Sequence, residues 1–296
     1  MLLGLNTQHF QLQLVWACYN TNREIYIPTL SFLQAVDGRP LEESRKSSQQ
    51  TNNNKLIFVG GFEHKKHKDI NKKFKDISDI NSTKLIDSNP TNSIKLANVL
   101  IDFTTPQSTL ENVKIASLNK TAVIIGTTGM TEAQKKKVKS FAKKIPILMS
   151  SNMSLGVNLL FNLVQQTSHA LKDVDYDIEI SETHHKHKKD APSGTALSLG
   201  EYAAEGRKIS LNKSKVLDRT KKLTSRKKGD IGFSVIRGGE IAGEHTVSFI
   251  GENDRVDLVH KANNRSIFVQ GAIDAAIFLS KKKSGFYSMN DLLFSK

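Results

Sequence analysis

The segment 182–195 holds the densest group of side chains in this chain that could do chemistry. Three histidines and three lysines occupy residues 184–189, and the segment ends in Pro192, Ser193, Gly194 and Thr195. Amides and hydroxyls at a helix start can bind a carboxylate. Histidine titrates near neutrality, and lysine both donates a proton and attracts an anion. The segment therefore favours proton delivery to a substrate that carries negative charge.

Two other interpretations of this segment are a solvated basic loop and a histidine metal site. A metal is disfavoured because no carboxylate or thiolate spacing supports it and because the lysines would repel a cation. We therefore predict no metal. A pair of histidines is more often structural, but Lys188 and the adjoining anion-binding turn favour the catalytic interpretation.

The elements that precede this segment alternate between strands and helices. Short apolar runs predict buried strands at 56–59, 98–103, 122–125 and 145–149. Thr105 and Pro106 predict a helix through residue 118, and Thr131 with Gln134 forms a capping-box pattern that predicts another. This alternation predicts an α/β fold with a Rossmann-like parallel sheet, which binds its ligands at the carboxyl ends of the strands.

The pattern changes after residue 152. Helices are predicted at 155–171 and 195–204, and strands at 177–180, 231–235, 245–249 and 255–259. Consecutive strands without intervening helices predict a second, α+β domain with a mixed or antiparallel sheet. We place the first domain at 1–152, completed by the carboxyl-terminal segment 266–296 with its apolar helix, and the second at 153–265.

Composition excludes several classes of protein. Hydrophobic residues make up 38% of the 296 residues, and no apolar run approaches the ~20 residues that a bilayer requires. The single Cys18 excludes a disulfide scaffold and a cysteine zinc site. A chain without disulfides is by default a protein of the reducing cytosol, so we expect a cytoplasmic location.

The net charge of +14 invites a nucleic-acid hypothesis. The lysines of the chain are scattered and rarely interleaved with aromatic residues, which favours a solvated surface over a nucleic-acid site. The densest basic stretch, 207–228, carries ten basic residues and only Asp218 to oppose them. It is either a solvated loop or a site of attraction for an anionic ligand. We predict neither a nucleic-acid nor a membrane partner.

The residues 184–197 resemble the signature of the 4-hydroxy-tetrahydrodipicolinate reductase family of lysine biosynthesis. The resemblance extends over IDFT at 101–104, GTTG at 126–129, SNMSLGVN at 151–158, GEHT at 243–246 and HKA at 260–262. It covers about residues 55–296. It implies a homotetramer in which the first domain binds NADH or NADPH, and the second binds the substrate and forms the oligomer. The implied reaction reduces the dicarboxylate 4-hydroxy-tetrahydrodipicolinate to tetrahydrodipicolinate on the diaminopimelate route.

The resemblance also implies roles for individual residues. His184 and Lys188 occupy the positions of the proton-transfer residues, and His185, Gly194 and Thr195 those that hold the substrate's carboxylates. The segments that contact the nicotinamide half of the cofactor correspond to Gly126, Thr127 and Thr128 and to Ser150, Ser151, Asn152 and Met153.

Glu63 follows the strand 56–59 and two glycines, where an acidic side chain can accept hydrogen bonds from the ribose hydroxyls of a dinucleotide. The next residues, His64, Lys65 and Lys66, could receive a 2′-phosphate, so NADH and NADPH both remain open. A solvated charged loop is the alternative interpretation of this stretch.

The amino-terminal segment 1–54 departs from the family pattern. It lacks the glycine-rich turn that holds the pyrophosphate, and only Gly38 and Arg39, after the run 25–33, match that turn. The abrupt change of composition near residue 55 is typical of a frameshift or a misassigned start. An alternative function is therefore a catalytically impaired family member that binds a dicarboxylate but lacks a working dinucleotide site.

Overall fold

The structure of the chain is a computed structural model, and it describes residues 12–18, 56–76, 83–172, 175–220 and 225–295. Gly38 and Arg39 lie outside the described residues. The chain divides into two compact units, Met1–Ser150 with Phe268–Lys296 and Ser151–Ile267. The ligand-binding roles expected of the two units remain predictions. Among the described helices, none is both long and apolar enough to cross a membrane.

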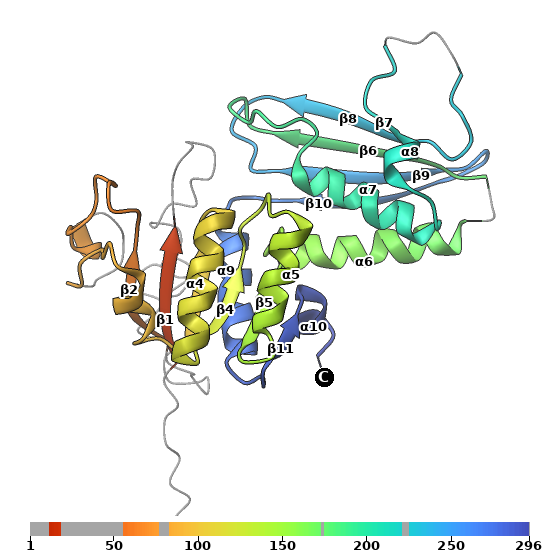
Figure 1. Cartoon of the computed structure of the whole chain (residues 1–296). Coiled ribbons are helices and arrows are strands. Elements are labelled where there is room, and N and C mark those ends of the chain that lie inside the picture. Colours follow the sequence, from red (N-terminus) through yellow and green to blue (C-terminus); the bar gives the residue numbers. More distant parts are fainter. Residues whose placement is uncertain (1–11, 19–55, 77–82, 173–174, 221–224, 296) are drawn as a thin grey trace, which may run out of the picture. The chain divides into compact units, whose positions relative to one another are not determined.

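The first unit is built on a six-stranded sheet in which all neighbouring strands are parallel (Figure 1). Its order is β2 (Leu56–Phe62), β1 (Leu12–Cys18), β3 (Val99–Phe103), β4 (Ala122–Ile125), β5 (Pro146–Met149) and β11 (Gly285–Tyr287), read from the β2 edge. The strand order reverses at β1, which lies between β2 and β3. This arrangement confirms the predicted Rossmann-like sheet.

The helices of the first unit begin where the sequence predicts them. Helix α4 (Pro106–Asn119) has Thr105 as its N-cap, and α5 (Glu132–Phe141) has the complete capping box of Thr131 and Gln134. Their buried residues pack against the apolar runs of β3 and β4. Helix α9 (Ser266–Leu279) lies behind the sheet in Figure 1. The short helices α3 (Pro90–Ile94) and α10 (Met289–Leu293) were not predicted.

The second unit has a five-stranded sheet and two long helices, α6 (Leu155–Ala170) and α7 (Gly194–Gly206). Its strand order is β10 (Arg255–Lys261), β9 (Glu244–Ile250), β6 (Asp177–His184), β8 (Ile231–Arg237) and β7 (Lys215–Val216). Strand β6 is antiparallel to β9 and parallel to β8, so the sheet is mixed, as predicted. The short helix α8 (Leu211–Ser214) and β7 lie within the basic stretch 207–228.

Strand β6 carries the core of the second unit into its polar site. Alternate residues of a strand share one face, and Ile178 and Ile180 place that face in the core between the sheet and the helices. The same face continues through Glu182 to His184, which are also buried. The buried face therefore changes from aliphatic to ionisable at the end of the strand, and the two ionisable side chains are held by a packed core.

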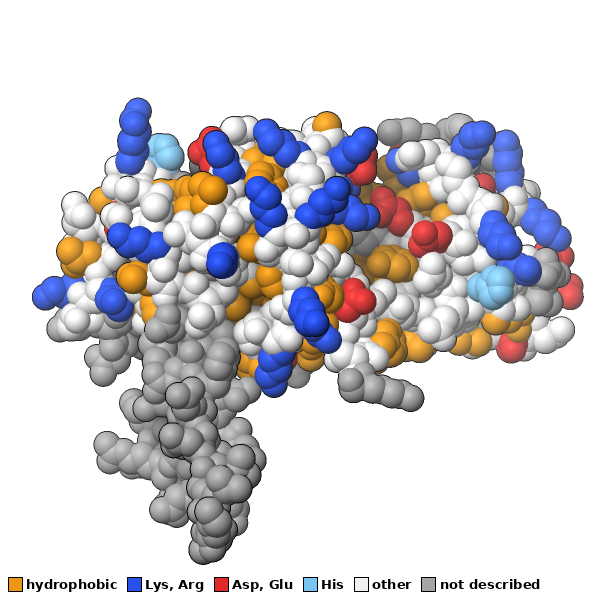
Figure 2. All heavy atoms as spheres, turned by 60° about the horizontal axis from the view of Figure 1, so that its bottom comes forward, with side chains coloured by type: hydrophobic (Ala, Val, Ile, Leu, Met, Phe, Trp, Pro, Cys, Tyr) orange, Lys and Arg blue, Asp and Glu red, His pale blue; other side chains and the backbone are white. Residues whose placement is uncertain are grey.

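Lysine and arginine side chains are dispersed over the face of the molecule in Figure 2. They do not gather into one stripe there, and acidic side chains lie among them. On this face, the dispersal is typical of a solvated surface.

Candidate active site

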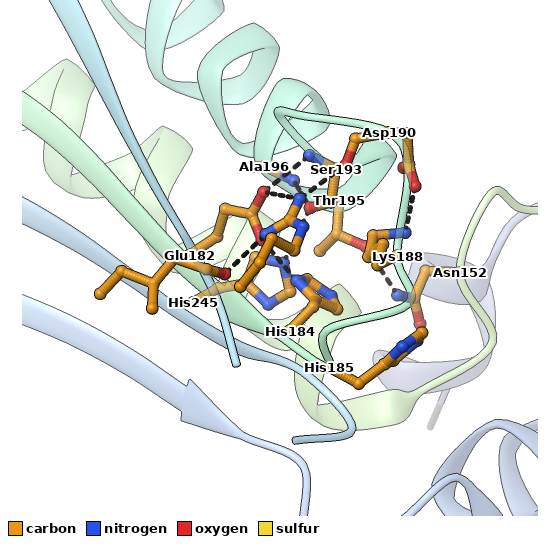
Figure 3. Close-up of polar contacts among 12 residues, drawn as sticks. Asn152, Glu182, His184, His185, Lys188, Asp190, Ser193, Thr195, Ala196 and His245 are labelled. Atoms are coloured by element: carbon orange, nitrogen blue, oxygen red, sulfur yellow. Dashed lines mark hydrogen bonds and ion pairs between the residues drawn. The ribbon is translucent and has the colours of Figure 1, made fainter. Parts of the chain in front are cut away.

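Glu182 is the centre of the polar network in the second unit (Figure 3). Its side chain is 1% exposed, and it accepts hydrogen bonds from Arg237 Nη1 at 3.0 Å and Arg237 Nη2 at 2.8 Å. The backbone N–H of Ser193 donates to it at 2.9 Å, and Nδ1 of His184 is in direct hydrogen-bond contact with it. One buried carboxylate thus joins a histidine, an arginine and the start of α7.

The contacts of Glu182 favour its charged form. Burial raises the pKa of a carboxyl group, but the hydrogen bonds from the His184 ring, the Arg237 guanidinium and a backbone amide outweigh burial and lower the pKa of Glu182 to about 2. Glu182 is therefore ionised throughout the physiological range.

His184 is fixed on two sides of its ring. Nδ1 faces Glu182, and the ring packs edge-on against His245, with 5.1 Å between centroids. The opposite nitrogen, Nε2, lies beside Gly243, because a Cβ built on Gly243 would be 2.9 Å from it. Gly243 has a φ of 153°, a backbone conformation that L side chains rarely adopt. Glu182 thus engages Nδ1, whereas Nε2 lies against the backbone at Gly243.

We predict that Gly243→Ala lowers kcat. The added methyl group would crowd Nε2 of His184, and it would strain the backbone by roughly 1–3 kcal/mol. We expect kcat to fall about tenfold, as expected when a contact of ~1.4 kcal/mol is lost. Steady-state kinetics with circular dichroism check this, with Gly239→Ala as the control, because its φ of 54° is also positive but nothing lies within 4 Å of its Cβ position. An equal fall in both variants would show that backbone strain alone is responsible.

The loop after β6 presents Lys188 and His185. Nζ of Lys188 lies 2.6 Å from Oδ1 of Asp190, and the Lys188 side chain is 22% exposed. Burial raises the pKa of Asp190, but the hydrogen bond from Lys188 outweighs it and holds the pKa below its usual value. Arg265 Nη2 lies 2.9 Å from Nε2 of His185, and burial together with this positive charge lowers the pKa of His185. His185 is therefore neutral near pH 7, with its Nδ1 carrying the proton.

The predicted anion-binding turn forms the start of α7. Ser193 is the N-cap and accepts a hydrogen bond from the amide of Ala196 at 3.2 Å. Gly194 is exposed, and Thr195 Oγ1 accepts a hydrogen bond from Asn152 Nδ2 at 3.2 Å. The partial positive charge of a helix N-terminus favours a carboxylate at this position.

His245 extends the network beneath the turn. Its Nε2 is 3.2 Å from the hydroxyl of Ser193, and burial with the nearby His184 lowers the pKa of His245 to about 3. Ligand atoms of Glu182, His184 and His245 lie within 4.8 Å of one another, a grouping that could in principle hold a metal. Glu182 is already paired with Arg237, and His184 Nδ1 and His245 Nε2 each have a hydrogen-bond partner, so these atoms fit a hydrogen-bond network better than a cation site. Nδ1 of His245 is buried without a hydrogen-bond partner among the described residues.

Four residues of this site were not predicted from the sequence: Glu182, Arg237, His245 and Arg265. Two of them carried a signal: Glu182 lies two residues before His184 and so shares its face of the strand, and His245 lies in the GEHT segment that the resemblance covers. Arg237, His245 and Arg265 reach the site through strand pairing or from a distant loop, and residue spacing does not reveal such contacts.

In the first unit, Gly126, Thr127 and Thr128 follow β4. The Gly126 amide donates to the Asp102 carbonyl at 2.8 Å, and Thr127 Oγ1 accepts a hydrogen bond from Thr109 Oγ1 at 2.8 Å. Thr127 is buried and Thr128 is exposed. The segment therefore lies at the carboxyl end of the sheet, with one side chain anchored inward.

Asp102 anchors this loop from the end of β3. It is buried, and it accepts hydrogen bonds from the Thr104 amide at 2.9 Å and from Asn112 Nδ2 at 3.0 Å. Thr127 Oγ1 is also 3.4 Å from Oδ1 of Asp102. Burial raises the pKa of Asp102, and the hydrogen bonds oppose that effect. Asp102 thus links the ends of β3 and β4.

The remaining residues predicted to bind the cofactor lie at strand ends. Ser150 follows β5 and donates its amide to the Ile125 carbonyl at 3.1 Å. Ser151 is exposed, whereas the side chain of Met153 is buried. Glu63 follows β2, is buried, and accepts the amide of His64 at 2.9 Å. Burial raises the pKa of Glu63 to about 7. Their roles toward a cofactor remain predictions.

Comparisons with known proteins give the family. Models of the dihydrodipicolinate reductase N-terminus and C-terminus match residues 46–153 and 156–293. A 4-hydroxy-tetrahydrodipicolinate reductase of Zymomonas mobilis is 48% identical over 199 residues, which are 67% of this chain and 78% of that protein. The enzyme of the same name from Agrobacterium fabrum is 48% identical over 208 residues, which are 70% of this chain and 76% of that protein.

Among solved structures, a dipicolinate-bound dihydrodipicolinate reductase from Paenisporosarcina sp. TG-14 has a TM-score of 0.68 at 21% identity. It covers 95% of this chain and 99% of that chain, and shows the same fold. An amine dehydrogenase from Mycobacterium smegmatis has a TM-score of 0.57 at 7% identity and covers 94% of this chain and 95% of that one. The fold and the sequence agree: this chain belongs to the 4-hydroxy-tetrahydrodipicolinate reductase family.

Proposed function

We propose that this protein catalyses the reduction of 4-hydroxy-tetrahydrodipicolinate to tetrahydrodipicolinate by NADH or NADPH, on the diaminopimelate route to lysine. The observation that carries the proposal is the array in the second unit, where the buried carboxylate of Glu182 holds His184 and the start of α7, and Asp190 holds Lys188 in the loop between them. Such an array suits a substrate that carries two negative charges and must receive a proton. The relatives of this chain from Zymomonas mobilis and Agrobacterium fabrum are named after this reaction.

We assign substrate binding to the cationic and amide groups of the second unit. Gly194 and Thr195 would hold one carboxylate at the start of α7, where backbone amides point outward. His185, with Arg265 at 2.9 Å, would face the other. Because Arg237 balances the charge of Glu182, the buried carboxylate would not repel the dianion.

The cofactor supplies a hydride when bound, and the protein supplies the proton. Lys188 is our candidate for the proton donor, because its ammonium group is partly exposed and held by Asp190. His184 would act through Nε2, because Nδ1 is engaged by Glu182. General acid catalysis of this kind typically accelerates a reaction by about 10²–10⁴.

The first unit fits a nicotinamide dinucleotide at the described strand ends. Glu63 offers a carboxylate next to β2, as a ribose requires, and the 126–128 segment carries amides at the end of β4. Ser150, Ser151, Asn152 and Met153 would complete the contacts to the nicotinamide half. The pyrophosphate turn, predicted at Gly38 and Arg39, falls outside the described residues.

Glu63 predicts a pH-dependent choice between cofactors. With a pKa of about 7, its carboxyl group is neutral at pH 6 and ionised at pH 8. Ribose hydroxyls donate more strongly to the ionised form, by ~1 kcal/mol, whereas a 2′-phosphate is repelled by it. We expect the ratio of NADH to NADPH affinity to rise about fivefold from pH 6 to pH 8. Fluorescence titrations check this, and Glu63→Gln should abolish the rise, since its amide cannot ionise.

We propose two further features of this enzyme, which concern its assembly and its location in the cell. It is a homotetramer, with the second unit forming the oligomer, and it is cytoplasmic. Analytical ultracentrifugation tests the first feature, and a predominantly monomeric protein at micromolar concentration would contradict it.

The function is tested with freshly generated substrate. NADH and NADPH oxidation are followed at 340 nm, beside direct titration of each reduced cofactor and of dipicolinate. Turnover with either cofactor supports the proposal. Binding of dipicolinate with neither cofactor binding nor turnover would identify an impaired family member instead.

A further inference from the structure

Glu182 contacts both halves of the proposed site through different oxygen atoms. Oε2 faces Nδ1 of His184, and Oε1 accepts the amide of Ser193, the N-cap of α7. Each oxygen also accepts one hydrogen bond from the Arg237 guanidinium. We infer that Glu182 is a positioning residue, which keeps the proton of His184 on Nδ1 and fixes that ring relative to the anion-binding turn.

The chemistry of the carboxylate determines the tautomer of His184. An ionised carboxylate only accepts hydrogen bonds, so the ring nitrogen that faces it must carry a proton. In the neutral ring, Nε2 is then the unprotonated atom, and when the ring gains a proton, that proton enters at Nε2. Proton exchange with a substrate therefore passes through the nitrogen that lies beside Gly243.

The geometry explains why a carboxylate this deeply buried is tolerated. Arg237 makes a paired, two-point contact that satisfies one position on each oxygen, and this leaves one position on each for the site. The arginine also offsets the negative charge, which would otherwise oppose a dicarboxylate substrate. Glu182 can therefore hold both His184 and Ser193 without weakening anion binding.

This inference rests on the proposed reaction, and it is tested by Glu182→Gln. Glutamine keeps the size of the side chain, but its amide can donate to Nδ1 and so stabilise the opposite tautomer. We expect kcat to fall about 30-fold, with KM for the substrate changing less than about twofold, as for residues that orient a reacting histidine. The matched control is Glu179→Gln on the same strand, which also removes an arginine-bound carboxylate, here one bound by Arg219 and Arg226.

The second measurement reads the tautomer without turnover. Protein labelled with ¹⁵N-histidine is studied by long-range ¹H–¹⁵N NMR at a pH where the ring is neutral, and His184→Asn assigns the signal. We expect the proton of His184 on Nδ1 in the unaltered protein and in Glu179→Gln, and on Nε2 in Glu182→Gln.

Three results would overturn the inference: a proton on Nε2 in the unaltered protein, a loss of kcat no larger than in Glu179→Gln, or a loss confined to KM. If Glu182→Gln does not fold, the spectrum of the unaltered protein still decides. If the unaltered protein binds dipicolinate but shows no turnover, the proposed reaction fails, whereas the NMR result on Glu182 stands separately.

Discussion

Replacing Lys188 with alanine is expected to lower kcat by about 10²–10³-fold, within the range that a general acid contributes. Of the lysines in the loop after β6, Lys188 is the one that the resemblance places in proton transfer. Its ammonium group is 2.6 Å from Asp190 and its side chain is 22% exposed, so it is held near the turn yet remains within reach of a ligand. Alanine removes the proton donor and one positive charge.

The effect of Lys188→Ala should be unequal among the kinetic constants. Affinity for NADH should stay within about twofold, because the residues assigned to the cofactor lie elsewhere, whereas KM for the dicarboxylate rises with the lost charge. Lys186→Ala is the matched control, because Lys186 lies in the same loop but pairs with Glu240 at 3.2 Å and is 60% exposed. Stopped-flow measurement of cofactor oxidation separates chemistry from binding. A kcat in Lys188→Ala equal to that of Lys186→Ala would remove Lys188 from the mechanism.

The sequence predicted the local features of the site well because these features depend on residues that are close together in the chain. The N-caps Thr105 and Thr131 and the turn before α7 each depend on side chains within four residues of one another. The buried strands of the parallel sheet are uninterrupted apolar runs, and such runs need no distant partner to be recognised.

The contacts that complete the site depend on strand register instead. Arg237 lies opposite His184 in the β6–β8 pair, and His245 lies opposite Glu182 in the β6–β9 pair. A shift of one residue in either pair would turn these side chains to the other face. Register is set by packing of the whole sheet, so a single sequence does not reveal that Arg237 neutralises Glu182. Strand β1 also depends on pairing. It lies in a polar amino-terminal segment, and its pairing with β2 and β3 identifies it as a strand.

The second large effect concerns stability. Arg237→Met should lower the free energy of unfolding by about 3–5 kcal/mol, because it leaves the charge of Glu182 buried without its partner. Arg237 also donates to the Asp190 carbonyl at 2.6 Å, so the loop that carries Lys188 should loosen as well. Urea denaturation monitored by circular dichroism measures the loss. Arg226→Met is the comparison variant. It makes the same change of side chain, but Arg226 binds carboxylates that are more exposed than Glu182.

A double variant separates uncompensated charge from lost packing. If the charge of Glu182 causes the instability, Glu182→Gln combined with Arg237→Met should be more stable than Arg237→Met alone, as expected for coupled neighbours.

The stability of the protein in acid gives an independent check. The pKa of Glu182 is about 2 in the folded protein and about 4.5 unfolded, so its stabilising contribution is present above pH ~4.5 and lost as the pH falls toward 2. The double variant should lack that part of the pH dependence. Equal stability of the single and double variants, with unchanged acid sensitivity, would show that Arg237 acts through packing and not through the charge of Glu182.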